Sequence, residues 1–172
     1  MAHAVTEADF EKQPRGPYRF DRWKCREGVS TALGPFAVSL QIVGKNDTNP
    51  PDSEMVRRAS DLVTYTQNNA EDILDIVYGH YLFVSQHPDW LQECGVPLNL
   101  SRDGVLQYLG DDRSLVVSRH LDWQEPYAST IFMVPKWDEE HALRLEFLEG
   151  TIASLNECGF RLNGGILTWI QR

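Results

Sequence analysis

The sequence has few cysteines, and none of them has the spacing of a metal or redox motif. Cys25, Cys94 and Cys158 form an odd set without a Cys-x-x-Cys arrangement, whereas small secreted domains usually carry paired cysteines. We therefore expect three reduced, mostly buried thiols and a cytoplasmic location. Residues 1–17 lack the apolar stretch of a signal peptide. No segment approaches the ~20 apolar residues of a membrane span, so a membrane partner is not expected.

Clusters of lysine and arginine are also missing. The chain has 16 basic and 25 acidic residues, a formal net charge of −9, and its acidic residues are spread along its length. Nucleic-acid binding needs clustered basic side chains that displace counterions, so nucleic acid is not an expected partner. An acidic domain attracts basic partners, and this attraction speeds their encounter. We therefore expect a protein partner of basic character.

No catalytic motif is recognisable. The sequence contains no P-loop, dinucleotide-binding fingerprint, nucleophile elbow or HExxH helix. The closest glycine-rich stretch, around residues 163–165, has the composition of a turn. The sequence therefore predicts no cofactor and favours a function without catalysis.

The 172 residues are enough for one domain with a substantial core. Residues 1–17 are polar and include Pro14 and Pro17, so we expect a loosely ordered N-terminal arm. Residues 18–172 are expected to form a single α+β domain.

Hydrophobic periodicity predicts the order of the elements. Every second residue is apolar in 36–42, within the segment 35–43, which predicts a strand. Helices are expected over residues 53–67, capped by Ser53, and 70–86. Further strands are expected over residues 18–25, 114–121, 129–135, 142–148, 151–155 and 166–170. This order predicts a largely antiparallel sheet, with two to four helices inserted between N-terminal and C-terminal strands.

The most distinctive polar cluster, WDEEHAL, lies between two predicted strands and places Asp138, Glu139 and Glu140 beside His141. Carboxylates and imidazoles are common metal ligands, so one hypothesis is a metal site of Asp138, Glu140 and His141, completed by His120. A neighbouring carboxylate could also make His141 an acid–base group. The structural alternative is that Asp138 accepts hydrogen bonds from the backbone and His141 pairs with a carboxylate.

Trp123 and Trp137 lie in or beside predicted loops, near acidic residues. Exposed tryptophan is typical of binding hot spots, although such rings also cover the edges of a core. The binding hypothesis predicts one contact surface with these members: Trp123, Glu125, Trp137, Asp138, Glu139, Glu140 and His141. His80 and His87 are expected at the surface or boundary of their helix.

The segment WDEEHAL, with its flanking strands and the turn Glu149-Gly150, resembles the C-terminal motif of a group of bacterial domains of unknown function. The motif runs from a strand through Trp-Asp-x-Glu-His-(Gly or Ala)-Leu to a second strand, a turn and a third strand. Ala142 stands where glycine is common. Some members of the group look like neighbours of toxin and immunity systems, which implies a small acidic interaction protein. The resemblance provides no catalytic residue.

Three functional hypotheses follow from the sequence. The first is a non-catalytic binding protein, an immunity-type or regulatory partner of a basic protein. The second is a metal-binding module or metal-dependent hydrolase that uses the WDEEHAL cluster. The third is a structural domain in which WDEEHAL only organises the sheet.

Overall fold

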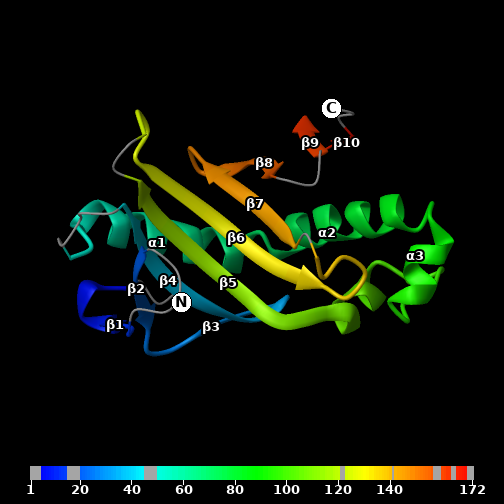
Figure 1. The fold of residues 1–172 in the computed structure, drawn as a ribbon, viewed down its shortest axis with the longest axis horizontal. Coiled ribbons are helices and arrows are strands. Elements are labelled where there is room, and N and C mark those ends of the chain that lie inside the picture. Colours follow the sequence, from blue (N-terminus) through cyan, green and yellow to red (C-terminus); the bar gives the residue numbers. More distant parts are fainter. Residues whose placement is uncertain are drawn as a thin grey trace.

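The computed structural model describes residues 5–14, 20–44, 50–120, 123–140, 142–156, 160–163 and 166–169, with side chains up to residue 153. The strands are β1 (Phe10–Lys12), β2 (Phe20–Cys25), β3 (Val29–Thr31), β4 (Gly34–Val43), β5 (Leu109–His120), β6 (Tyr127–Pro135), β7 (Leu143–Leu148), β8 (Thr151–Asn156), β9 (Phe160–Asn163) and β10 (Ile166–Trp169). The helices are α1 (Ser53–Asn68), α2 (Ala70–Val84) and α3 (Pro88–Glu93), with 3-10 turns η1 (Glu7–Asp9) and η2 (Asp103–Tyr108). The expected α+β class is confirmed (Figure 1).

The main sheet has eight strands, in the order β1-β2-β4-β5-β6-β7-β8, with β3 paired to β4. Its pairs are antiparallel, apart from β4 and β5, which run parallel in the register Ala37 to Ser114 through Val43 to His120. Parallel strands need a long crossover, and α1, α2, α3 and η2 provide it. Strands β9 and β10 form a separate antiparallel pair.

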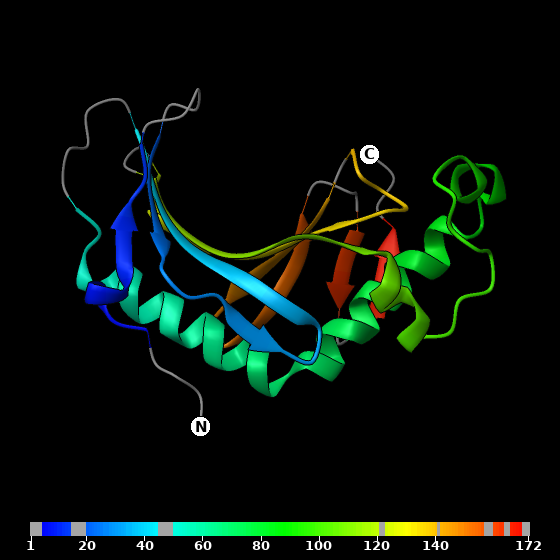
Figure 2. The same ribbon diagram turned by 90° about the horizontal axis from the view of Figure 1, so that it is seen from below.

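The core lies between the helices and one face of the sheet. Figure 2 shows that α1 and α2 run along one face of the curved sheet. The alternation expected in β4 is confirmed, since Phe36, Val38, Leu40 and Ile42 are all buried. They share the core with Leu115 and Val117 of β5, and with Met55, Ala59, Leu62 and Val63 of α1. The alternation in the strands and the 3.6-residue period of the helices therefore converge on one interior.

The cap of α1 differs from the prediction. Asp52, not Ser53, is the N-cap, and its carboxylate accepts a hydrogen bond from the Met55 amide at 2.9 Å. An N-cap side chain satisfies one of the unpaired amide groups of the first turn. Asn69 adopts φ −122° and ψ 32° and separates α1 from α2, which matches the expected break.

Part of the predicted N-terminal arm belongs to the sheet. Strand β1 pairs with β2, with Phe10 opposite Cys25, and the Arg26 amide donates to the Asp9 carbonyl at 2.9 Å. Val5 is buried in the core. A strand of three residues is too short to show a period, which is why the sequence did not indicate it.

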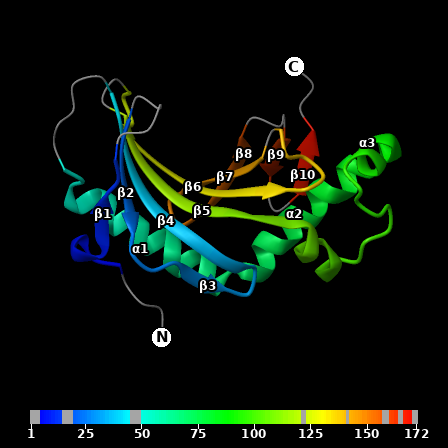
Figure 3. The same cartoon turned by 60° about the horizontal axis from the view of Figure 1, so that its bottom comes forward.

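Figure 3 shows the two ends of the molecule, with β1 and the start of α1 at one end and α3 at the other. Among the helices of the described residues, none combines the length and apolar composition needed to cross a membrane.

The WDEEHAL segment contains a residue with a left-handed backbone conformation. Ala142 has φ +55°, and its amide donates to the Asp138 carbonyl at 3.2 Å. Glycine adopts this left-handed conformation without cost, whereas a residue with a Cβ is strained there by about 1–2 kcal/mol. Glu149 and Gly150 also have positive φ and form the tight β7–β8 turn that was expected.

Ala142→Gly is therefore expected to raise the free energy of unfolding by up to about 1 kcal/mol, because strain is removed. The matched control is Ala59→Gly in the middle of α1, which should lower it by about 1 kcal/mol or more. Urea unfolding of both variants measures the difference. If Ala142→Gly lowered the free energy of unfolding as much as Ala59→Gly, backbone strain at Ala142 would be contradicted.

Candidate functional site

The predicted contact residues lie at opposite ends of strand β6. Trp123 and Glu125 precede the strand, while Trp137 and Asp138 follow it. The strand has nine residues, and an extended chain rises about 3.3 Å per residue, so the two groups are separated by roughly 30 Å. The prediction of one continuous contact surface is therefore wrong.

The same separation removes His120 from the predicted metal site. His120 ends β5 beside the start of β6, because Arg119 pairs with Tyr127. It cannot share a metal with Asp138 and Glu140 at the other end of β6. His141 lies outside the described residues. Within the ranges that the structure describes, no group of three or more His, Cys, Asp or Glu side chains could hold a metal ion.

Trp137 is a core residue and not a surface one, which corrects its place in the predicted contact surface. Its side chain is only 2% exposed. The indole N–H donates to Nδ1 of His80 at 3.0 Å, and the ring packs edge-on against Tyr81 with centroids 5.5 Å apart. The ring therefore anchors the loop after β6 to helix α2.

His80, predicted at the surface or boundary of α2, is also buried, with 1% of its surface exposed. Indole nitrogen can only donate, so Nδ1 of His80 must be the unprotonated acceptor and Nε2 carries the proton in the neutral ring. Nε2 lies 3.6 Å from a carboxylate oxygen of Asp138. Trp137 therefore fixes this loop to α2, and the Asp138 carboxylate lies near the same imidazole.

The next two residues of WDEEHAL, Glu139 and Glu140, are exposed. Together with Glu93 and Asp138, they lie near enough to Cys94, which follows the end of α3, for their charges to act on its thiol. The pKa of the Cys94 thiol is raised, and the largest cause is burial. The nearby negative charges raise it further, in the order Glu139, Glu93, Asp138 and Glu140. We name Glu93, Asp138, Glu139 and Glu140 the acidic end surface. Two segments far apart in the sequence therefore create one concentration of negative charge.

An exposed aromatic ring stands beside the acidic end surface. Trp90 is 55% exposed and lies three residues before Glu93 on α3, so the two share one helix face. Its ring stacks on His87, with centroids 4.6 Å apart. Across the described part of the chain, Glu93, Glu139 and Glu140 form no ion pair. Trp90 and Glu93 were not among the predicted contact residues, although their i, i+3 spacing is visible in the sequence.

A cleft lies at the other end of β6, between α1, the start of β6 and the β7–β8 turn. Its volume is about 510 Å³, and it is lined by Arg57, Arg58, Asp61, Glu125, Tyr127, Ser129, Phe147, Leu148, Glu149 and Gly150. Glu125 is the one predicted contact residue in this lining. The residues from α1 carried no sequence signal, because a charged helix face is usually only solvated.

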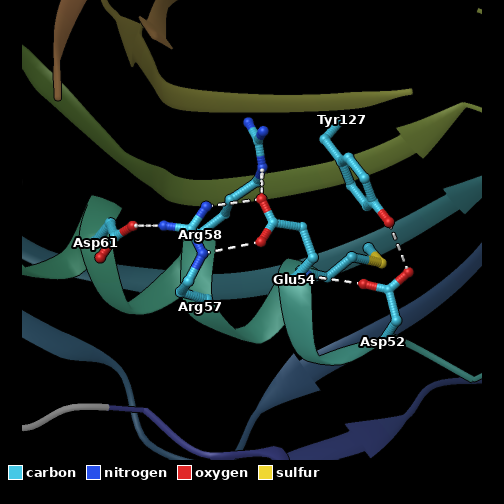
Figure 4. Close-up of polar contacts among 7 residues, drawn as sticks. Asp52, Glu54, Arg57, Arg58, Asp61 and Tyr127 are labelled. Carbon is cyan, nitrogen blue, oxygen red and sulfur yellow. Dashed lines mark hydrogen bonds and ion pairs between the residues drawn. The ribbon is translucent and has the colours of Figure 1, made fainter. Parts of the chain in front are cut away.

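The first turns of α1 carry two polar clusters beside this cleft (Figure 4). Asp52 accepts hydrogen bonds from the Tyr127 hydroxyl at 2.9 Å and from the largely buried Arg119. Partial burial alone would raise the pKa of Asp52, but hydrogen bonds from the Met55 amide, Arg119 and Tyr127 outweigh it, so the pKa is lowered. This carboxylate thus ties α1 to β5 and β6.

Glu54 forms the second cluster. It accepts hydrogen bonds from Arg57 at 2.7 and 2.8 Å and from Arg58 at 2.7 Å, and Arg57 also donates to Asp61 at 2.7 Å. The Arg58 guanidinium lies over the Tyr127 ring, 5.1 Å from its centroid. The hydrogen bonds from Arg57 and then Arg58 lower the pKa of Glu54 to about 2.

Glu54 therefore predicts a specific pH dependence. Its pKa is depressed in the folded state from a usual value of 4.5. The stabilisation is thus complete above pH 4.5 and is lost as the pH falls towards about 2. Urea unfolding between these pH values should show the stability difference between wild type and Glu54→Gln shrinking as the pH falls. A difference that stays constant would contradict the assignment.

Trp123 and Glu125 are exposed, as expected. The Trp123 ring is 57% exposed and stacks flat on His120, with centroids 3.7 Å apart and planes 4° apart. Nε2 of His120 lies 3.0 Å from the Ser118 hydroxyl, and burial lowers the pKa of the imidazole. The Trp123 ring therefore stacks on an imidazole that is uncharged at neutral pH.

No family model, curated protein or solved structure matches this chain.

Proposed function

We propose that the protein is a non-catalytic binding protein whose acidic end surface docks a basic protein partner. The observation that carries the proposal is the concentration of Glu93, Asp138, Glu139 and Glu140 around Cys94, beside the exposed ring of Trp90. Charges of one sign attract a partner of the opposite sign from a distance, and a central aromatic ring adds contact energy. The resemblance of WDEEHAL to domains near toxin and immunity systems supports an immunity-type or regulatory role.

The WDEEHAL segment combines a buried residue with exposed carboxylates, which also supports this role. Trp137 holds the start of the loop against α2 through His80. Glu139 and Glu140 follow on the same loop, are exposed, and have no ion-pair partner among the described residues. Exposed carboxylates without an ion-pair partner are available to the basic side chains of a partner.

The test is capture of a partner by immobilised protein from an extract of the native host. The variant is Glu139→Gln/Glu140→Gln. The control is Glu125→Gln/Glu149→Gln, which removes the same charge from exposed carboxylates at the other end of β6. We expect wild type and control to retain a basic protein at about 0.05 M salt and to release it at about 0.5 M. The variant should retain much less.

Two outcomes would overturn the proposal. Retention of the same protein by the Glu139→Gln/Glu140→Gln variant and by wild type would place the contact elsewhere. If wild type retained no basic protein in low salt, the proposal that the partner is basic would be wrong.

A further inference from the structure

We propose that the cleft between α1, β6 and the β7–β8 turn binds a small zwitterion, an α-amino acid with an apolar side chain. This inference is independent of the basic partner, because the cleft and the acidic end surface lie at opposite ends of β6. The cleft volume of about 510 Å³ falls within the roughly 300–1,000 Å³ of small-ligand pockets.

Arg58 supplies the recognition group for a carboxylate. Its Nε donates to Glu54 at 2.7 Å, and its guanidinium is held over the Tyr127 ring. Among the described residues, the two terminal amino groups of Arg58 have no acceptor. Figure 4 shows them pointing away from Glu54 and from the axis of α1. The side chain is 27% exposed. A fixed guanidinium with two open donors matches the geometry of a carboxylate.

Arg57 shows why Arg58 is the distinctive residue. The neighbouring guanidinium also lines the cleft, but all three of its nitrogens already donate, to Glu54 and Asp61. Arg57 therefore has a structural role, whereas Arg58 presents unused donors.

The other residues that line the cleft suit the ammonium group and the apolar side chain of the ligand. Glu125 and Glu149 are exposed and form no ion pair within the described ranges, so they can accept from an ammonium group. They also disfavour a phosphate, because its second negative charge would be repelled. Phe147 and Leu148 provide apolar surface for a side chain. Carboxylate, ammonium and apolar side chain together define the α-amino acid class.

The test is a titration of the full chain with L-leucine, followed by amide chemical shifts and calorimetry. Concentrations up to about 10 mM exceed the ~1 mM dissociation constant of a weak site. We expect saturable shifts around Arg58 and Tyr127. Leucinamide lacks the carboxylate and N-acetyl-leucine lacks the ammonium group, so both should bind at least about tenfold more weakly, since each loses a charged hydrogen bond.

Two matched variants distinguish recognition from folding. Arg58→Gln and Arg57→Gln remove the same charge and each removes a partner of Glu54. We expect Arg58→Gln to weaken leucine binding about tenfold or more, and Arg57→Gln to change it less than about threefold. Equal losses in both variants, tighter binding of inorganic phosphate or N-acetyl-leucine, or no saturable binding would overturn the proposal. None of these results would affect the basic partner.

Discussion

Trp137→Ala is expected to lower the free energy of unfolding by about 3–5 kcal/mol, the usual cost of removing a large buried aromatic ring. The ring is buried between the loop after β6 and α2, where it packs against Tyr81. Its removal leaves a cavity and deprives Nδ1 of His80 of its donor. Because Asp138 follows directly, the loop that carries Glu139 and Glu140 should also lose its fixed position.

Trp137→Phe separates the two contributions. It keeps an aromatic ring but leaves Nδ1 of His80 unsatisfied, so we expect a smaller loss of about 1–3 kcal/mol. Urea unfolding measures both values, with Trp123→Ala as the matched control, because that ring is exposed. If Trp137→Ala were no more destabilising than Trp123→Ala, the buried position of the Trp137 ring against α2 would be contradicted.

Asp52→Ala is the second large effect, with an expected loss of about 2–4 kcal/mol from the helix cap and from the hydrogen bonds to Arg119 and Tyr127. The carboxylate accepts from the Met55 amide, the Tyr127 hydroxyl and Arg119. One side chain therefore joins the start of α1 to two strands of the sheet, and its loss affects all three elements.

A double-mutant cycle tests the ionic part. Arg119→Met alone leaves Asp52 with its cap and with Tyr127, and the double variant lacks both charges. We expect Asp52→Ala to cost less in the Arg119→Met background, because the ionic contact between the two side chains is already absent there. Additive losses would show that Asp52 and Arg119 do not stabilise each other.

The sequence predicted the fold class because its longest elements are strongly periodic. Strand β4 alternates over its core-facing residues, and α1 places Met55, Ala59, Leu62 and Val63 on one stripe. Such a pattern indicates which face of a helix or strand is buried, even when the elements that pack against it are unknown. Strand β1 was missed because three residues carry no period, and the parallel pairing of β4 and β5 was missed because it joins distant segments.

The contact surface was only partly predictable, because loop residues give no information about burial. Trp137 follows a strand in a polar segment, yet His80, which holds it, is 57 residues away in the sequence. Nothing local indicates that pairing. The grouping of Trp123 with Glu139 failed for a related reason, since the direction of β6 places them at opposite ends. Glu93 and Glu139 are 46 positions apart in the sequence, and only the folded chain lets both charges act on Cys94.

The most direct test of the binding function is the association rate constant for the captured basic partner, measured by stopped flow at low and high salt. Charges at the edge of an interface act mainly on this rate. We expect Glu139→Gln/Glu140→Gln to lower it at least about fivefold at low salt and to remove most of its salt dependence. The charge-matched control Glu125→Gln/Glu149→Gln should behave like wild type. Equal rates for both double variants would contradict the assignment of the acidic end surface as the docking site.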